Sequence, residues 1–172
     1  FVDSNEQTLG IDPYALCDWL KTTTYQHSGV CVNRNTGNRI QALVPVHVYG
    51  NPCELEGLLK VAHDFNLTLI EDAAESIGSW YHGKHTGTLG LMGTLSFNGN
   101  KTITTGGGGA ILTDNYELAR RAKHLSTTAK VAHKWEYIHN EVGFNYRMPN
   151  LNAALGCAQL EKLQQFIESK KQ

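Results

Sequence analysis

Short apolar runs alternate with amphipathic stretches along the whole chain. The run 40–48 (IQALVPVHV) predicts a buried strand interrupted at Pro45, and 67–70 (LTLI) predicts a second, shorter strand. Two further runs, 91–97 and 110–113, predict strands on either side of a polar, glycine-rich loop. Short buried strands separated by helical patterns are typical of an α/β fold.

Three amphipathic segments predict helices, and a polar segment between residues 22 and 39 predicts a loop or a hairpin. Asn51 is expected to cap the first helix and Asp114 the second, because both side chains suit an N-cap. The third helix is expected to run from Asn150 to about Ser169. Apolar residues at helical spacing predict one buried face in each helix: Leu55, Leu58, Leu59, Ala62 and Phe65; Leu118, Ala119, Ala122 and Leu125; and Leu151, Ala154, Leu155, Ala158 and Phe166.

Composition and charge argue against several classes of protein. With 172 residues and 41% hydrophobic content the chain suits one globular domain, and a net charge of -1 without a basic stripe argues against a nucleic-acid partner. No apolar run approaches the roughly 18 residues that cross a bilayer. The four cysteines form no C-x-x-C pair, which indicates reduced thiols in a cytoplasmic protein. His82 and His85 lack a second pair of ligands, so a polar turn is expected there and no metal site.

Polar side chains with complementary chemistry follow the predicted strands in a fixed order. Asp72 follows the second strand, Ser96 ends the third, and Lys101 lies in the loop after it. Ligands of open α/β sheets collect beyond the carboxyl ends of strands. A partly desolvated lysine can form a Schiff base, a carboxylate can keep a pyridine nitrogen protonated, and a hydroxyl can bind phosphate. Ala73 and Ala74 leave room for a flat ring, so together these residues favour a phosphorylated aromatic aldehyde as cofactor.

Each of these residues also has a simpler interpretation when taken alone. Lys101 could be a solvated loop lysine, and Asp72 could be a helix cap or a turn acid. The glycines at 106–109 could form a loose turn or, in a nucleotide-binding protein, a phosphate loop. The run lacks both the G-K-[ST] ending of a P-loop and the G-x-G-x-x-G pattern of a dinucleotide fold.

Several longer strings resemble one known family. EDAAESIG at 71–78, GTLG at 87–90 and SFNGNKTITTGGGG at 96–109 resemble the DegT/StrS-type nucleotide-sugar aminotransferases. The resemblance continues at PVHVYG, 45–50, and at GFNYRM, 143–148, and so covers nearly the whole chain. The Asn-Gly-Asn-Lys form looks most like the branch that makes 4-amino sugars for legionaminic acid and related nonulosonates.

The resemblance implies a fold, a cofactor and a reaction. The expected fold is the three-layer α/β/α large domain of fold-type I, the aspartate-aminotransferase-like class. The expected cofactor is pyridoxal 5'-phosphate (PLP), and the expected assembly is a homodimer with shared active sites. The implied reaction moves an amino group, with L-glutamate as the expected donor, to C4 of a 4-keto-6-deoxy nucleotide sugar.

The resemblance also assigns roles by position. Lys101 would carry PLP as a Schiff base and transfer the proton, and Asp72 would pair with the pyridine nitrogen. Ala74 would pack on the ring, and Ser96 would contact the phosphate. Asn145 matches a residue that reaches the phosphate of the neighbouring subunit's cofactor.

One position departs from the family pattern. Many relatives have Gln or His where this chain has Glu75, a cofactor-binding position near the 3′-oxygen and the sugar, so the role of Glu75 is open. Some relatives replace the Schiff-base lysine with His and are sugar dehydratases. Lys101 therefore favours the aminotransferases.

The extent of the match raises an alternative. The chain lacks an initiator Met, and family members are about twice its length. Residues 1–172 are expected to be the central part of the PLP-binding large domain, without the N-terminal segment and the C-terminal small domain. Such a piece cannot supply all seven strands expected of that domain. The alternative is a catalytically incompetent fragment that acts as a folding or dimerisation module.

Overall fold

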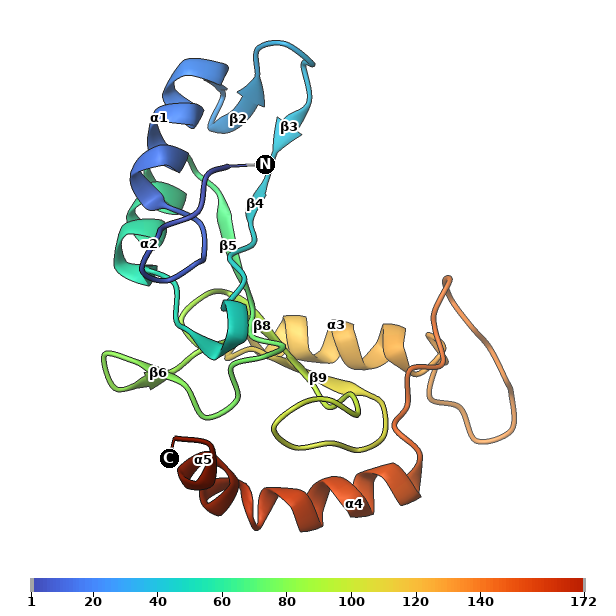
Figure 1. The fold of residues 1–172 in the computed structure, drawn as a ribbon. Coiled ribbons are helices and arrows are strands. Elements are labelled where there is room, and N and C mark those ends of the chain that lie inside the picture. The colour runs from blue at the N-terminus through green and yellow to red at the C-terminus, as the bar shows by residue number, and fades with distance from the viewer. Residues whose placement is uncertain (1, 172) are drawn as a thin grey trace.

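The centre of the molecule is a four-stranded mixed sheet. The structure is a computed structural model that describes residues 2–171. The strand order is β4-β5-β8-β9, in which the first three strands are parallel and the last is antiparallel to β8 (Figure 1). The sheet confirms the predicted α/β fold, and its strands are β4, Ala42–Leu43; β5, Thr68–Asp72; β8, Met92–Ser96; β9, Gly109–Leu112. The first strand is much shorter than the predicted run 40–48, because Ile40 pairs with the hairpin strand β2 and residues 44–47 lie outside the strands.

Two helices cover one face of this sheet. Helix α1, Pro13–Thr23, and helix α2, Leu55–Asp64, pack against each other and against the β4–β5 half. Apolar side chains withdrawn from water here contribute about 25 cal/mol per Å² to folding. The buried cluster includes most of the predicted face of α2 and consists of Leu16, Leu20, Cys31, Leu43, Cys53, Leu55, Leu58, Val61, Ala62 and Leu69.

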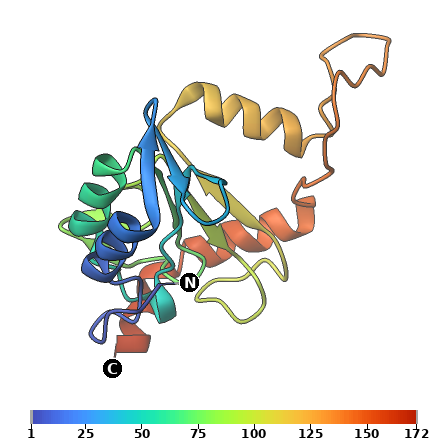
Figure 2. The same ribbon diagram turned by 90° about the horizontal axis from the view of Figure 1, so that it is seen from above.

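Three helices lie on the other side of the sheet (Figure 2). They are α3, Tyr116–Ser126, α4, Asn150–Leu160, and α5, Leu163–Lys171. The single long helix predicted near the C-terminus is therefore two helices, separated at residues 161–162. Part of the segment 127–149 between α3 and α4 extends away from the body of the molecule (Figure 2), whereas residues 146–149 lie beside β8 and β9.

The predicted buried face of the last helix is wrong for this chain. Leu151 is 86% exposed and Leu155 43%, and Ala154 and Ala158 are exposed as well. Among residues 2–171, no element packs over this side of α4. Phe166 is half-buried.

Helix α2 begins later than its sequence predicts. Its cap is Glu54, whose carboxylate accepts hydrogen bonds from the backbone N–H three residues later. Asn51 instead follows a short 3₁₀ turn, Val48–Gly50. The cause is tertiary: the N–H of Cys53 donates to the His47 ring, so the chain cannot enter the helix at this point.

Helix α3 begins one residue later than predicted. Asn115 caps it by accepting a hydrogen bond from the N–H of Leu118 at 3.0 Å. The N–H of Asn115 itself donates to the hydroxyl of Thr113, a local turn that keeps Asn115 extended. Asp114 therefore lies within the turn and does not cap the helix.

Two antiparallel hairpins flank the main sheet. The polar segment 22–39 forms the predicted hairpin, with a third short strand added to it: β1, Thr24–His27; β2, Val30–Asn33; β3, Arg39–Ile40. The second hairpin pairs β6, Trp80–Tyr81, with β7, Lys84–His85, through a turn in which His82 and Gly83 both have positive φ.

The sequence predicts neither a membrane-spanning segment nor a metal site, and the helices and side chains of residues 2–171 bear on both points. None of their helices is long and apolar enough to cross a membrane. No group of three or more His, Cys, Asp or Glu side chains in this part of the chain could hold a metal ion.

Candidate functional site

The carboxyl ends of β5 and β8 bring two predicted site residues to one edge of the sheet. The strands are parallel, with Asp72 opposite Thr94, so Asp72 and Ser96 both end at this edge. The loop that leaves β8 carries Lys101. Backbone bonds from Phe97 N to Gly108 O at 2.9 Å and from Thr105 N to Phe97 O at 3.0 Å close this loop onto itself. The lysine therefore has a defined position beside the strand ends.

Lys101 forms an ion pair with Glu75. Its Nζ lies 3.2 Å from Glu75 Oε1, and the two side chains are 16% and 39% exposed. The backbone N–H of Lys101 donates to Asn98 O at 3.1 Å. A partly desolvated amine with a carboxylate neighbour is an environment in which a lysine can act chemically.

Glu75 connects the lysine to a strained turn. Its Oε2 accepts a hydrogen bond from the N–H of Tyr49 at 2.9 Å. That backbone bond, together with Lys101, lowers the pKa of Glu75. Tyr49 has left-handed backbone angles, φ 53 and ψ 23, which a non-glycine residue adopts only where its surroundings hold it. Glu75 is thus an ionised bridge between Lys101 and the 48–50 turn.

The Asp72 backbone is held on both sides. Its N–H donates to Pro45 O at 2.9 Å, and its carbonyl accepts from the N–H of His47 at 3.1 Å. Its Oδ1 accepts from the N–H of Ala74 at 3.1 Å, whereas Oδ2 accepts no hydrogen bond from residues 2–171. The side chain is half-buried. One carboxylate oxygen thus remains available at the strand end.

The remaining predicted residues divide into two groups. Ala74 is half-buried beside Asp72, and the Ser96 hydroxyl accepts a hydrogen bond from the N–H of Asn98 at 3.3 Å. Asn145 is exposed and lies in the extended segment beyond α3, where its backbone pairs with Thr127. The structure therefore gathers five of the six predicted residues at one sheet edge, and Asn145 lies apart from them.

Two buried polar residues beneath this edge were not predicted as part of the site. His47 Nε2 and Glu71 Oε2 lie 3.1 Å apart, and both side chains are 0% exposed. The alternation of buried and exposed positions along these two segments could have indicated them. Pro45 and His47 occupy alternate buried positions of the segment that follows β4, as Leu69 and Glu71 do in β5. A polar residue at a buried position needs a partner, and these two partner each other.

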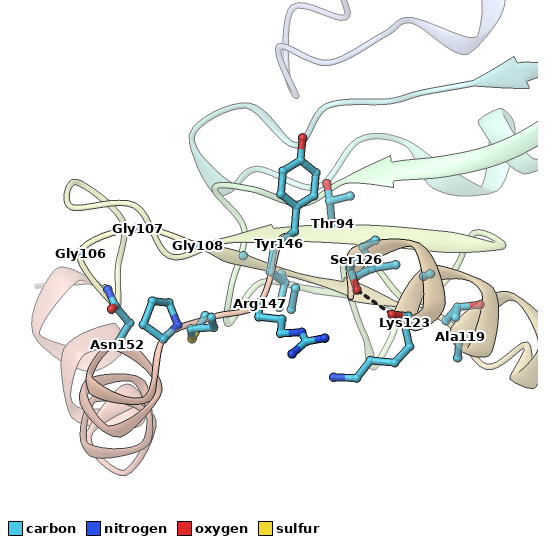
Figure 3. A pocket seen from close by; sticks show the side chains of 18 residues that line it. Thr94, Gly106, Gly107, Gly108, Ala119, Lys123, Ser126, Tyr146, Arg147 and Asn152 are labelled. Atoms are coloured by element: carbon cyan, nitrogen blue, oxygen red, sulfur yellow. Dashed lines mark hydrogen bonds between the residues drawn. The ribbon is translucent and has the colours of Figure 1, made fainter. Parts of the chain in front are cut away.

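A cavity among the described residues lies apart from Lys101. It has a volume of about 890 Å³ and lies between the glycine run 106–109, α3 and residues 146–149, with Lys123 and Arg147 in its lining (Figure 3). None of Lys101, Asp72 and Glu75 lines it. Gly106 and Gly108 have φ of +78 and +120, so the run needs glycine in order to turn.

Comparison with known proteins identifies relatives along the whole sequence. The model of the DegT/DnrJ/EryC1/StrS aminotransferase family matches residues 1–172. GDP-perosamine synthase of Escherichia coli O157:H7 is 43% identical over 87% of this chain and 41% of its own. UDP-4-amino-4,6-dideoxy-N-acetyl-beta-L-altrosamine transaminase of Campylobacter jejuni is 35% identical over 77% of this chain and 36% of its own. The chain thus spans about two fifths of the length of these relatives.

Solved structures share the fold. Helicobacter pylori PseC, an aminotransferase of pseudoaminic acid biosynthesis, has a TM-score of 0.79 and 27% identity, over 94% of this chain and 39% of its own. The E. coli GDP-4-keto-6-deoxy-D-mannose-3-dehydratase, solved with bound hydrated PLP, has a TM-score of 0.78 and 28% identity, over 98% of this chain and 43% of its own. These neighbours confirm the predicted fold-type I class.

Proposed function

The chain belongs to the DegT/DnrJ/EryC1/StrS aminotransferase family, and from this premise we propose that it is the central part of the PLP-binding large domain of a nucleotide-sugar aminotransferase. The observation that carries the proposal is the half-buried Lys101, held 3.2 Å from Glu75 beside the ends of β5 and β8. The matched relatives are more than twice as long, so the proposed activity belongs to a protein that contains this segment.

The residues at the sheet edge fit PLP chemically. PLP supplies an aldehyde that condenses with amines and a ring that withdraws electrons when its nitrogen is protonated. Lys101 has an accessible amine with which to hold the aldehyde, and Asp72 has an oxygen without a partner among residues 2–171 with which to hold a proton on the ring nitrogen. Ala74 is small enough to lie against the ring face, and the Ser96 hydroxyl can donate to the phosphate.

Lys101 and Glu75 together provide a route for the proton. With PLP bound, Lys101 would be the residue that holds the aldehyde, and its amine would be the group that moves the proton of the substrate carbon. Glu75 stays ionised at neutral pH, because its pKa is lowered by the Tyr49 N–H and by Lys101. The carboxylate would thus hold and orient the amine. We propose this as the role of the residue that replaces the Gln or His of many relatives.

The proposed substrate is a 4-keto-6-deoxy nucleotide sugar with its carbonyl at C4, and the proposed donor is L-glutamate. Support comes from the Campylobacter relative, whose name places an amino group at C4 of a 4,6-dideoxy sugar. Relatives carry GDP or UDP in their names, so the nucleotide is one question for the assay. The legionaminic-acid branch within the family stays a prediction.

We also propose a homodimer with shared active sites in the cytoplasm. Asn145 is exposed, and its backbone pairs with Thr127 just beyond α3. This position suits a residue that contacts the cofactor phosphate of a neighbouring subunit. The four cysteines are free thiols, which suits a reducing compartment.

The test is an amino-transfer assay of the full-length protein with glutamate and a panel of GDP-, UDP- and TDP-linked 4-keto-6-deoxy sugars. We expect one nucleotide to be preferred and 4-amino product to form. Lys101→Ala is expected to lower turnover by at least about 1000-fold, because the amine has no substitute, while Lys60→Ala, on the exposed side of α2, retains wild-type turnover. Unchanged turnover in Lys101→Ala would refute the proposal.

A second candidate is a folding or dimerisation module without catalysis. The exposed apolar side chains of α4, Leu151, Leu155 and Leu160, favour it. An intact-mass measurement of the natural protein distinguishes the two. A mass near 19.0 kDa with no PLP binding would support the module, and a mass near twice that value would support the enzyme.

A further inference from the structure

The Glu71 carboxylate is the most completely bonded side chain near the site. It is 0% exposed and accepts four hydrogen bonds. Oε2 accepts from His47 Nε2 at 3.1 Å and from Gly87 N at 2.7 Å. Oε1 accepts from Leu89 N at 2.6 Å and from Gly90 N at 2.7 Å. Charge-assisted bonds of this kind are about twice as strong as neutral ones, so one side chain fixes the whole 87–90 loop.

The bonds of His47 define its tautomer. Its Nδ1 accepts a hydrogen bond from the N–H of Cys53 at 3.1 Å and therefore carries no proton. The ring proton is then on Nε2, where it is donated to Glu71. The neutral imidazole thus has one acceptor, which binds the N–H of Cys53, and one donor, which binds Glu71.

The same two residues hold the backbone around Asp72. His47 donates its backbone N–H to the carbonyl of Asp72 at 3.1 Å while its ring binds the preceding residue, Glu71. The loop held by Glu71 lies against the residue that follows Asp72. A Cβ at Gly87 would lie 3.0 Å from Ala73 Cβ, closer than most such contacts. The position of Asp72 is therefore fixed through both of its neighbours in the chain, Glu71 and Ala73.

We infer that Glu71 and His47 are positioning residues, which together fix the backbone of Asp72 so that its carboxylate can hold the cofactor's ring nitrogen. This inference rests on the proposed function, because it assigns Asp72 to the cofactor. Neither side chain is exposed to solvent, so both act through Asp72.

The bonding of Glu71 makes Glu71→Gln a sharp test. Each carboxylate oxygen accepts from two N–H donors. An amide nitrogen placed at either position would face two donors, whichever way the amide turns. A substitution that preserves the shape of the side chain thus disrupts the loop by its hydrogen bonds alone.

His47 offers a matched pair of variants. His47→Gln places an amide nitrogen near the Nε2 position and keeps the donor to Glu71. His47→Asn places an amide oxygen near the Nδ1 position and keeps the acceptor for Cys53, but leaves Glu71 without this donor. Both variants remove the ring, so a difference between them reports the bond to Glu71.

The experiment measures PLP binding and the pH profile of the bound cofactor's absorbance in the full-length protein, below the melting temperature of each variant. We expect Glu71→Gln and His47→Asn to bind PLP at least about tenfold more weakly, equivalent to about 1.4 kcal/mol, and to shift the pH profile. His47→Gln is expected to bind within about threefold of wild type. A purely structural role would lower only the melting temperature and leave affinity and profile unchanged in the folded protein, which would overturn the inference.

If the variants do not fold, a measurement on the wild-type protein still tests the inference. Heteronuclear NMR is expected to show His47 protonated at Nε2 only, and slow amide exchange at Gly87, Leu89 and Gly90. A proton on Nδ1 or rapid exchange at these amides would refute the inference. If wild-type protein fails to bind PLP, the proposed function fails. If Glu71→Gln binds PLP like wild type, only the positioning role fails.

Discussion

Residues 11–72 and residues 109–171 show the same kind of helical pattern but differ in what covers it. In the first region α1 and α2 pack on the parallel strands, and every residue of the buried cluster lies between Leu16 and Leu69. In the second region three helices contain a single buried residue, Gly156. Hydrophobic periodicity therefore identifies the face of a helix that favours burial, but it does not identify what buries it.

The candidate site lies between these regions and draws on both. Asp72 ends a strand of the covered region and Glu75 follows it, and the Glu71–His47 pair beneath them is fully buried. Lys101 comes from the loop that leads to the less covered region. The acidic residues of the site thus lie on a fully buried, hydrogen-bonded support, whereas the position of Lys101 depends on a single loop.

Truncation in the covered region should have the largest effect on stability. Leu58→Ala is expected to lower the free energy of unfolding by about 4 kcal/mol, because Leu58 is fully buried in the α1–α2 cluster. Leu59 was predicted on the same face but is 36% exposed, so Leu59→Ala is the matched control, with a loss of about 1 kcal/mol. Urea unfolding measures both. Equal losses would contradict the distinction between covered and uncovered positions.

Glu71→Gln should cost about 3 kcal/mol at pH 7, since it leaves buried donors without an acceptor. Burial alone would raise the pKa of Glu71, but the bonds from His47 and from the N–H groups of Gly90, Gly87 and Leu89 outweigh burial and lower it. The stabilisation from this group is therefore complete above its ordinary pKa of 4.5 and is lost as the pH falls through the lowered pKa.

The measurement for this prediction is urea unfolding of both proteins from pH 7 to pH 2. The difference between wild type and Glu71→Gln should shrink in acid, because the wild type alone loses the ionised carboxylate there. A difference that stays constant across this range would show that ionised Glu71 does not stabilise the fold.

The cap of α3, in the less covered region, should have a smaller effect on stability. Asn115→Ala is expected to destabilise α3 by about 1 kcal/mol, because the Asn115 side chain accepts the N–H of Leu118. Asp114→Ala, one residue earlier, should change the helix by less than about 0.5 kcal/mol. Amide exchange along α3 measures both. The opposite order would restore Asp114 as the cap.

Leu151→Ser should have the smallest effect. Leu151 is 86% exposed, so the free energy of unfolding of the 172-residue chain should change by less than about 0.5 kcal/mol. A loss above 2 kcal/mol, comparable to that of a core leucine, would mean that the face of α4 is covered in solution and would remove the contrast between the two regions.

The sequence was a good guide to the elements and to the order of the site residues. Strands at 92–96 and 109–112 lie within or next to their predicted ranges, since short apolar runs between polar loops allow few alternatives. The position of Asp72 and Ser96 at one edge followed from two neighbouring parallel strands. Each of these predictions depended on local pattern and on a general rule of α/β sheets.

What the sequence did not show depended on contacts between distant segments. Glu75 and Lys101 are 26 residues apart, and their ion pair depends on the path of the loop that closes at Phe97. Asn51 does not cap α2, because the ring of His47 binds the N–H of Cys53. The helical spacing correctly placed Leu151 on the apolar face of its helix. It could not show that no other part of residues 2–171 covers this face.

The most direct test of the central claim is to locate the cofactor chemically. The full-length protein would be incubated with PLP, reduced with borohydride and digested, and the modified peptide would be mapped by mass spectrometry. We predict a single modified residue, Lys101, and no modification of the Lys101→Ala variant. Modification of another lysine, with Lys101→Ala still active in amino transfer, would contradict the account.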